Sequence, residues 1–140
     1  MRHIVCAAAL LVGMAFGQNP NTQYPLQVKV VQTETIRVPT GAGSTTSCWF
    51  YGKGMNCNSM TTENSRWRSV MLVKVSDGNA YIIACDASLF AKCNWLRPGD
   101  TYQARWVKHG LSVVAYSLDN KKKRMETTYY VVSSKPLEGN

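Results

Sequence analysis

Histidine is scarce in this chain, which has two histidines in 140 residues. His3 lies at the start, and His109 precedes Gly110 in a stretch typical of a hairpin turn. A serine or cysteine nucleophile needs a base that a third group holds in place. Zinc sites need several histidine or cysteine ligands at close spacing. The sequence therefore predicts no catalytic residue, no metal site and no cofactor.

Acidic residues are also few, eight in all, and most lie at expected turns or loop edges. Asp77 and Asp100 have ready roles as turn residues. Glu34 is the exception, because it interrupts the apolar face of an expected strand. Glycoside hydrolysis needs two carboxyl groups at a set separation, a pairing that this pattern does not indicate. We therefore expect a non-catalytic protein. The alternative is a small secreted hydrolase or an enzyme inhibitor, and the enzyme alternative is tested by substituting His109 and Glu34.

A long hydrophobic run occurs only at the start of the chain. A basic start, an apolar run over residues 4–12 and the small-residue end Ala15-Phe16-Gly17 are typical of a secretory signal peptide. The run is shorter than the about 20 apolar residues of a permanent transmembrane helix. We therefore expect a secreted or periplasmic protein with no transmembrane segment. The expected parts are a signal peptide over 1–17, a disordered lead-in over 18–23, one β-barrel domain over 24–134 and a tail over 135–140.

The cysteine count becomes even once the signal peptide is removed. Five cysteines are present, and Cys6 lies in the apolar run, so the mature protein keeps Cys48, Cys57, Cys85 and Cys93. An even set in an oxidising compartment indicates disulfides. Spacing favours Cys48–Cys57 and Cys85–Cys93, because each closes a short loop, while the two other connectivities stay open. A four-cysteine zinc site is disfavoured because no two cysteines have the C-x-x-C spacing.

The remaining chain alternates between apolar and polar residues with the period of β-strands. Asp77-Gly78, between two strand-forming runs, is a strong hairpin signal because glycine adopts positive φ at little cost. Helical spacing in the mature chain is confined to Asp86–Trp95. The run that precedes Asp77 is apolar on both faces, which predicts a central strand. The expected strands are 26–38, 48–51, 55–57, 66–76, 80–85, 101–108, 111–118 and 125–133.

The first expected strand carries an irregularity. Gln32 and Glu34 interrupt its apolar face, so a bulge or a bend is expected there. The apolar residues that alternation places on that one face are Val28, Val30, Ile36 and Val38. Together the strands predict an all-β fold. We expect a small antiparallel β-barrel or sandwich, of OB-fold or SH3-like size, with one short helical turn after a cleaved signal helix.

Basic residues outnumber acidic ones by 16 to 8, and removal of Arg2 with the signal leaves a net charge of 15 − 8 = +7. A positive surface favours anionic partners. Small β-barrels bind oligonucleotides or sugars through aromatic stacking in a positive groove. An anionic polymer, either a glycan or a single-stranded nucleic acid, or a cell-envelope surface is therefore a possible partner. The candidate binding residues are Arg66, Trp67, Arg68, Arg105, Lys121, Lys122, Lys123 and Arg124.

A structural interpretation competes with this binding interpretation. Neighbouring residues in a strand point to opposite faces, so Trp67 would lie opposite Arg66 and Arg68. On this view Tyr102 and Trp106 fill the core while the arginines are solvated. The run from Lys121 to Arg124 would then be a solvated loop that keeps strand edges from pairing with other chains.

Several distinct turn and cysteine motifs occur along the mature chain. They are Tyr24-Pro25-Leu26, Cys48-x-x-x-Gly52-x-Gly54-x-x-Cys57, Asp77-Gly78 leading into Tyr81-x-x-x-Cys85, and Leu96-x-Pro98-Gly99-Asp100-x-Tyr102-x-Ala104-Arg105. This layout resembles a group of small secreted bacterial β-barrel proteins of unassigned function. The resemblance implies a secreted β-barrel and carries over no catalytic residue. We therefore expect an exported, disulfide-stapled binding or structural module.

Overall fold

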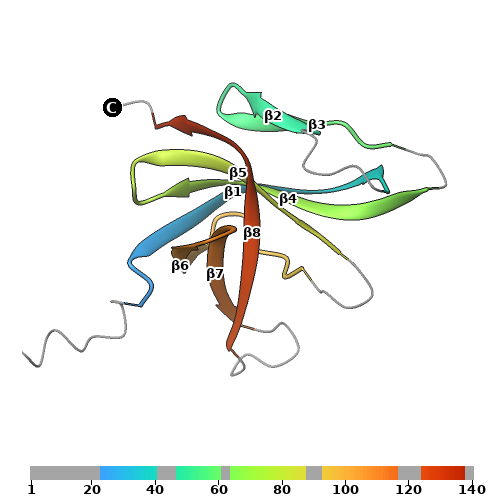
Figure 1. The fold of residues 1–140 in the computed structure, drawn as a ribbon. Coiled ribbons are helices and arrows are strands. Elements are labelled where there is room, and N and C mark those ends of the chain that lie inside the picture. Colours follow the sequence, from blue (N-terminus) through green and yellow to red (C-terminus); the bar gives the residue numbers. More distant parts are fainter. Residues whose placement is uncertain (1–22, 41–46, 61–63, 88–92, 117–123, 138–140) are drawn as a thin grey trace, which may run out of the picture.

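The computed structural model describes residues 23–40, 47–60, 64–87, 93–116 and 124–137. These ranges contain eight strands and no helix: β1 (Leu26–Pro39), β2 (Cys48–Tyr51), β3 (Gly54–Cys57), β4 (Ser65–Val75), β5 (Asn79–Asp86), β6 (Thr101–Val107), β7 (Gly110–Tyr116) and β8 (Arg124–Pro136). Six strands close an irregular antiparallel barrel in the order β1-β4-β5-β8-β7-β6, and β2 and β3 form a separate hairpin (Figure 1). The predicted all-β class is confirmed. The expected signal peptide and half of the expected helical turn, residues 88–92, lie outside the described residues.

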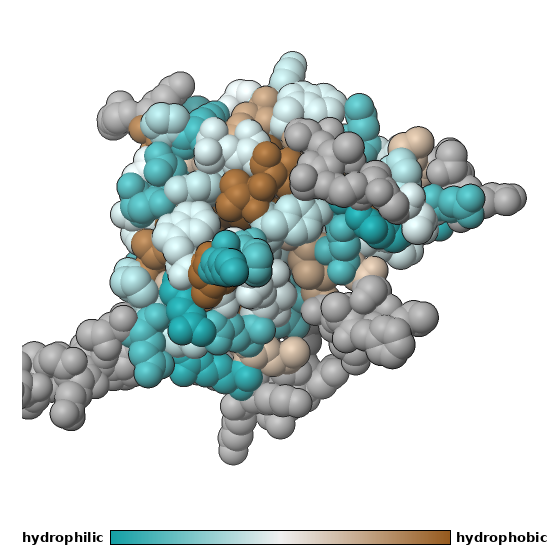
Figure 2. Space-filling view, in the orientation of Figure 1, coloured by the Kyte–Doolittle hydropathy of each residue, from teal (hydrophilic) through white to brown (hydrophobic). Residues whose placement is uncertain are grey.

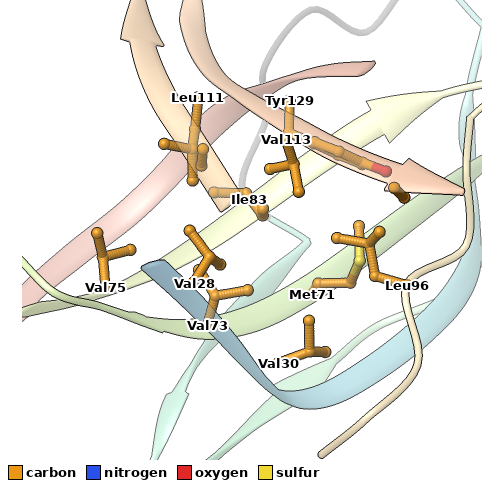
Figure 3. Packing of buried hydrophobic residues seen from close by; sticks show 12 residues of the cluster. Val28, Val30, Met71, Val73, Val75, Ile83, Leu96, Leu111, Val113 and Tyr129 are labelled. Carbon is orange, nitrogen blue, oxygen red and sulfur yellow. The ribbon is translucent and has the colours of Figure 1, made fainter. Parts of the chain in front are cut away.

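The interior of the barrel is filled by one apolar cluster. Figure 3 shows its side chains pointing toward one another from strands on all sides of the barrel. Tyr129 is fully buried in this cluster, and its hydroxyl donates a 2.5 Å hydrogen bond to the Asn94 carbonyl. The buried members are Val28, Val30, Met71, Val73, Val75, Ile83, Leu96, Ala104, Leu111, Val113, Ala115 and Tyr129.

Strand β1 changes the face that it buries halfway along. Its register with β4 shifts by one residue at Val31. Because side chains alternate, one extra residue moves the rest of a strand to the opposite face. Val28 and Val30 therefore enter the interior core, whereas Ile36 and Val38 belong to a second cluster outside the barrel. The expected bulge is confirmed, but the expectation that these four residues share one face is wrong.

The second cluster lies between the outer face of the barrel and the β2–β3 hairpin, and we call it the outer core. Its buried members are Ile36, Val38, Cys48, Met55, Val70, Leu72, Ile82 and Ala84. Strand β4 is thus buried on both faces, as expected for a central strand. Figure 1 shows the hairpin over the β1-β4-β5 side of the barrel and away from β6 and β7.

The β2–β3 hairpin is fastened to the barrel at the bulge of β1. The side-chain amide of Gln32 donates to the Met55 carbonyl and accepts from the Met55 amide, both at 3.0 Å. Gly54 allows this approach, since a Cβ there would lie 2.8 Å from Gln32 Oε1. The polar residue that interrupts the apolar pattern of the first strand is therefore the one that holds the hairpin.

Two disulfides complete the frame, and both pair the cysteines that the spacing favours. Cys48–Cys57 closes the base of the β2–β3 hairpin, where the two residues are directly opposite. Cys85–Cys93 joins β5 to the segment that carries Leu96 into the interior core. Each closed loop contributes about 2–3 kcal/mol in the chain-entropy account of disulfides.

Candidate functional site

Basic side chains gather around one carboxylate at the end of β5. Asp86 Oδ1 and Oδ2 accept from Arg68 Nε at 2.6 Å and Arg68 Nη2 at 3.3 Å, a two-pronged pair. Arg66 Nη2 lies 2.9 Å from Asp86 Oδ2, and the Tyr130 hydroxyl donates to Oδ1 at 3.1 Å. We call these four residues the Asp86 cluster. Its position follows from strand pairing, since Arg68 and Asp86 are directly opposite in the β4–β5 ladder.

The charges of the Asp86 cluster stabilise one another. Burial on its own raises the pKa of Asp86, but the hydrogen bond and charge of Arg68 outweigh it, so this pKa lies below its ordinary value. Burial and the charge of Asp86 raise the pKa of Tyr130 to about 12, so the phenol stays protonated and donates. Only 1% of the Arg68 side chain is exposed. Removal of the carboxylate partner of an arginine so deeply buried is expected to be strongly destabilising.

The structure separates the predicted run Arg66-Trp67-Arg68 as alternation requires. The two arginines reach Asp86, whereas Trp67 is exposed and lies under the Arg37 guanidinium, with 5.0 Å between Cζ and the ring centroid. The expectation that the arginines are solvated is wrong for Arg68. Its position in β4 faces the carboxylate of the neighbouring strand, and this pairing offsets part of the free-energy cost of removing the guanidinium from water.

The expectation for β6 also needs correction. Trp106 is 43% exposed rather than buried in the core. It packs edge-on against Tyr81, with 5.1 Å between ring centroids, because it is the penultimate residue of its strand, at the end of the barrel. Ala104 fills the corresponding interior position, and Tyr102 is half-buried against the interior core.

The remaining predicted arginines meet at Tyr24. Arg105 Nη2 lies 3.0 Å from Glu126 Oε1, and the guanidinium groups of Arg105 and Arg124 lie 5.3 and 4.8 Å from the centroid of the Tyr24 ring. A hydrogen bond from Ser112, with the charge of Arg105, holds the pKa of Glu126 below its ordinary value. Arg124 thus lies apart from the Asp86 cluster. The predicted cations Lys121, Lys122 and Lys123 lie outside the described residues.

His109 lies in the exposed turn between β6 and β7, as expected. It lines an open cleft of about 570 Å³ together with Lys108, Arg66, Asp86 and Tyr130. The carboxylate in this cleft is held by two arginines, so it is not available as an orienting group for the imidazole.

Figure 2 shows hydrophobic surface in the middle of the face on which β8 lies in front, with hydrophilic residues around it. Glu34, the other residue considered for acid–base chemistry, is exposed and accepts from Gln32.

A second basic region, which the sequence did not predict, crosses the outer face at the opposite end of the same strands. Lys29 of β1 is directly opposite Lys74 of β4, Lys74 is opposite Ala80 of β5, and Ala80 is opposite Lys135 of β8. Residues in such register share one face of the sheet. We call Lys29, Lys74 and Lys135 the lysine row. With adjacent strands about 4.8 Å apart, three steps give the row a length of roughly 14 Å.

A cleft of about 340 Å³ opens beside the lysine row, between the β2–β3 hairpin and the barrel. We call it the hairpin cleft. Lys135 Nζ lies 4.8 Å from the centroid of the Phe50 ring and 3.4 Å from the Gly52 carbonyl oxygen. The lining residues are Phe50, Gly52, Lys53, Gly54, Leu72, Lys74, Ala80, Lys135, Pro136 and Leu137.

The lysine row differs electrostatically from the Asp86 cluster. The ion pairs among the described residues involve Asp86 and Glu126, and none of them includes a lysine. Like charges that are directly opposite on a sheet destabilise it. Lys29 and Lys74 are such a pair, and Ala80, directly opposite Lys74 on the other side, carries no charge. The described residues thus place two ammonium-bearing side chains directly opposite each other on this face.

Comparison of the chain with protein-family models, with curated proteins and with solved structures found no match. The structure confirms the coarse content of the resemblance drawn from the turn and cysteine motifs, a small all-β protein with two disulfides. The described ranges contain no helix long and apolar enough to cross a membrane. In those same ranges, no three histidine, cysteine, aspartate or glutamate side chains gather as a metal site requires.

Proposed function

We propose that this protein is an exported, non-catalytic binding module that holds an anionic ligand at the lysine row. The two disulfides are consistent with an oxidising compartment, which supports export together with the signal-like first 17 residues. The exposed positions of His109 and Glu34 support a role in binding rather than in acid–base chemistry.

The register of three lysines across four strands carries this proposal. Lys29 and Lys74 oppose each other without an intervening carboxylate, which is a cost to the folded protein that a bound anion would remove. Proteins retain such locally unfavourable choices where function requires them.

Retention on an immobilised sulfated polysaccharide (heparin) tests this proposal. We expect the double variant Lys74→Met/Lys135→Met to elute at clearly lower salt than the wild type, because two contacts to sulfate are lost. The matched control is Arg97→Met/Lys108→Met, which removes the same charge from exposed positions outside the row. We expect the control to elute close to the wild type.

The salt dependence of binding sharpens the result. The slope of log affinity against log salt reports how many charges the polymer contacts. A slope that falls in the Lys74/Lys135 variant and stays unchanged in the control supports the proposal. Equal losses in both double variants would mean that net charge alone causes retention, and the lysine row would then have no special role.

A further inference from the structure

We infer that the hairpin cleft binds the apolar body of an amphiphilic anion, a molecule with a carboxylate, sulfate or phosphate head and an alkyl or aryl chain. This inference rests on the proposed function, because it assigns the anionic head to the lysine row. It adds a second determinant of binding, an apolar one, and so narrows the chemical class of the ligand.

The lining of the cleft combines the two chemistries that such a ligand presents. Leu72 and Ala80 are buried, whereas Lys53 and Lys74 are exposed, so apolar residues form the floor and ammonium groups the outer edge. Phe50 adds an aromatic wall. The volume of about 340 Å³ lies within the range of about 300–1,000 Å³ that is typical of small-molecule sites.

Lys135 is placed to serve both parts of the ligand. Its ammonium group lies over the Phe50 ring and 3.4 Å from the Gly52 carbonyl oxygen, which is a long hydrogen bond. An ammonium group has three donors, so an anionic head can be bound without loss of the contact with Gly52. Pro136 and Leu137, the two residues that follow Lys135, also line the cleft.

The wall of the cleft is fixed before any ligand binds. Cys48–Cys57 closes the base of the β2–β3 hairpin, and the two hydrogen bonds between Gln32 and Met55 hold the hairpin on the barrel. Binding to a preformed cleft avoids the entropy loss of ordering a loop. The cleft is therefore suited to a ligand of defined shape.

The length of the alkyl chain provides the direct test. Calorimetric titration of the full-length mature protein with acetate, butanoate and octanoate, and with octanol as the uncharged analogue, separates the two determinants. We expect affinity to rise with chain length, by up to about fourfold for each methylene that enters the cleft. We expect octanol to bind at least tenfold more weakly than octanoate.

Substitutions of residues that line the cleft test whether octanoate binds there. Lys74→Met and Lys135→Met should each weaken octanoate binding about three- to tenfold, since each removes one charged contact. Lys108→Met is the matched control, because it removes one charge from an exposed position outside both the lysine row and the hairpin cleft. We expect it to change octanoate binding less than twofold. Phe50→Ala should flatten the dependence on chain length, with its folding checked by thermal unfolding.

The outcomes separate this inference from the proposed function. Equal affinities for acetate and octanoate in the wild type would overturn the inference, while polysaccharide retention that depends on Lys74 and Lys135 would leave the proposed function standing. Octanol binding as tightly as octanoate would show that the charge is not recognised. If, in addition, the Lys74→Met/Lys135→Met variant were retained on heparin as strongly as the wild type, both this inference and the proposed function would be overturned.

Discussion

The Asp86 cluster lies on β4, β5 and β8, and the lysine row crosses the opposite end of these strands from β1 to β8. The two regions differ in the residue that β5 contributes. On the outer face of β4, Arg68 and Lys74 flank the outer core. Strand β5 places Asp86 opposite the arginine but Ala80 opposite the lysine. The same sheet therefore has one basic end that a carboxylate partly neutralises and one end, which we call the open end, where the described residues of the ladder place no carboxylate and where we propose that an anion binds.

The residue types fit this division. Arginine presents a planar fork that binds a carboxylate with two bonds, and it tolerates burial when it is paired. Lysine carries a compact, strongly hydrated charge on a flexible stem. Arg68 is buried and bound by two bonds, whereas Lys74 is exposed. The arginine contributes to the stability of the fold, and the lysine is suited to an exchangeable ligand.

Loss of the carboxylate at the neutralised end should have the largest effect on stability. Asp86→Asn removes the carboxylate that pairs with the buried guanidinium of Arg68, and we expect the free energy of unfolding to fall by about 3 kcal/mol. Denaturant unfolding measures this change. Asp100→Asn, at an exposed turn, is the control and should stay within about 0.5 kcal/mol of the wild type. Similar losses in the two variants would contradict a structural role for the cluster.

Low pH should remove the contribution that the ionised Asp86 carboxylate makes to the free energy of unfolding. The pKa of Asp86 is lower in the folded protein than in the unfolded chain, so its contribution is fully present above the unfolded value of about 4. It is lost progressively as the pH falls through the lower, folded value. The stability difference between wild type and Asp86→Asn should therefore shrink below about pH 4. Glu126, whose pKa is also lowered, acts equally in both proteins and cancels in the difference.

Much of the fold could be predicted because its signals are local. The Asp77-Gly78 turn, the alternation of apolar residues and the short cysteine spacings each involve neighbouring residues, and the turn, the strands and the disulfides that they predict are confirmed. The change of face in β1 could not be derived from alternation alone. It depends on where Gln32 meets Met55 of the separate hairpin, which is a tertiary contact.

The basic regions were predictable only in part. Alternation places Lys74 on the same face as Val70 and Leu72, which the structure shows to be the outer face, and the hairpin turn brings Ala80 opposite it. The lysine row, however, requires the pairing of β1 with β4 and of β5 with β8, which no local signal contains. Lys135 lies in the last strand, whereas the sequence placed it in the tail. Dense local charge directed the prediction to Arg66 and Arg68 instead.

A carboxylate introduced at position 80 of β5 should pair with the lysines at the open end, as Asp86 pairs with the arginines at the other end of the strand. Ala80→Asp places a negative charge between Lys74 and Lys135, its two cross-strand neighbours. We expect retention on heparin to fall strongly and octanoate binding to weaken about tenfold, because the new carboxylate competes for both ammonium groups. Ala80→Asn is the control of equal shape, and binding closer to the wild type is expected. Equal losses in both variants would point to a steric effect in the cleft.

The smallest expected effect is a gain in stability at the open end. Lys29→Thr removes the repulsion between Lys29 and Lys74, and we expect the free energy of unfolding to rise by about 0.3 kcal/mol. Gln27→Thr, at an exposed position two residues earlier in β1, controls for the strand preference of threonine. The gain should disappear in 1 M salt, where the screening length is about 3 Å. A loss of stability in Lys29→Thr but not in Gln27→Thr would mean that the lysine contributes to the fold, and the two ends would then no longer differ in kind.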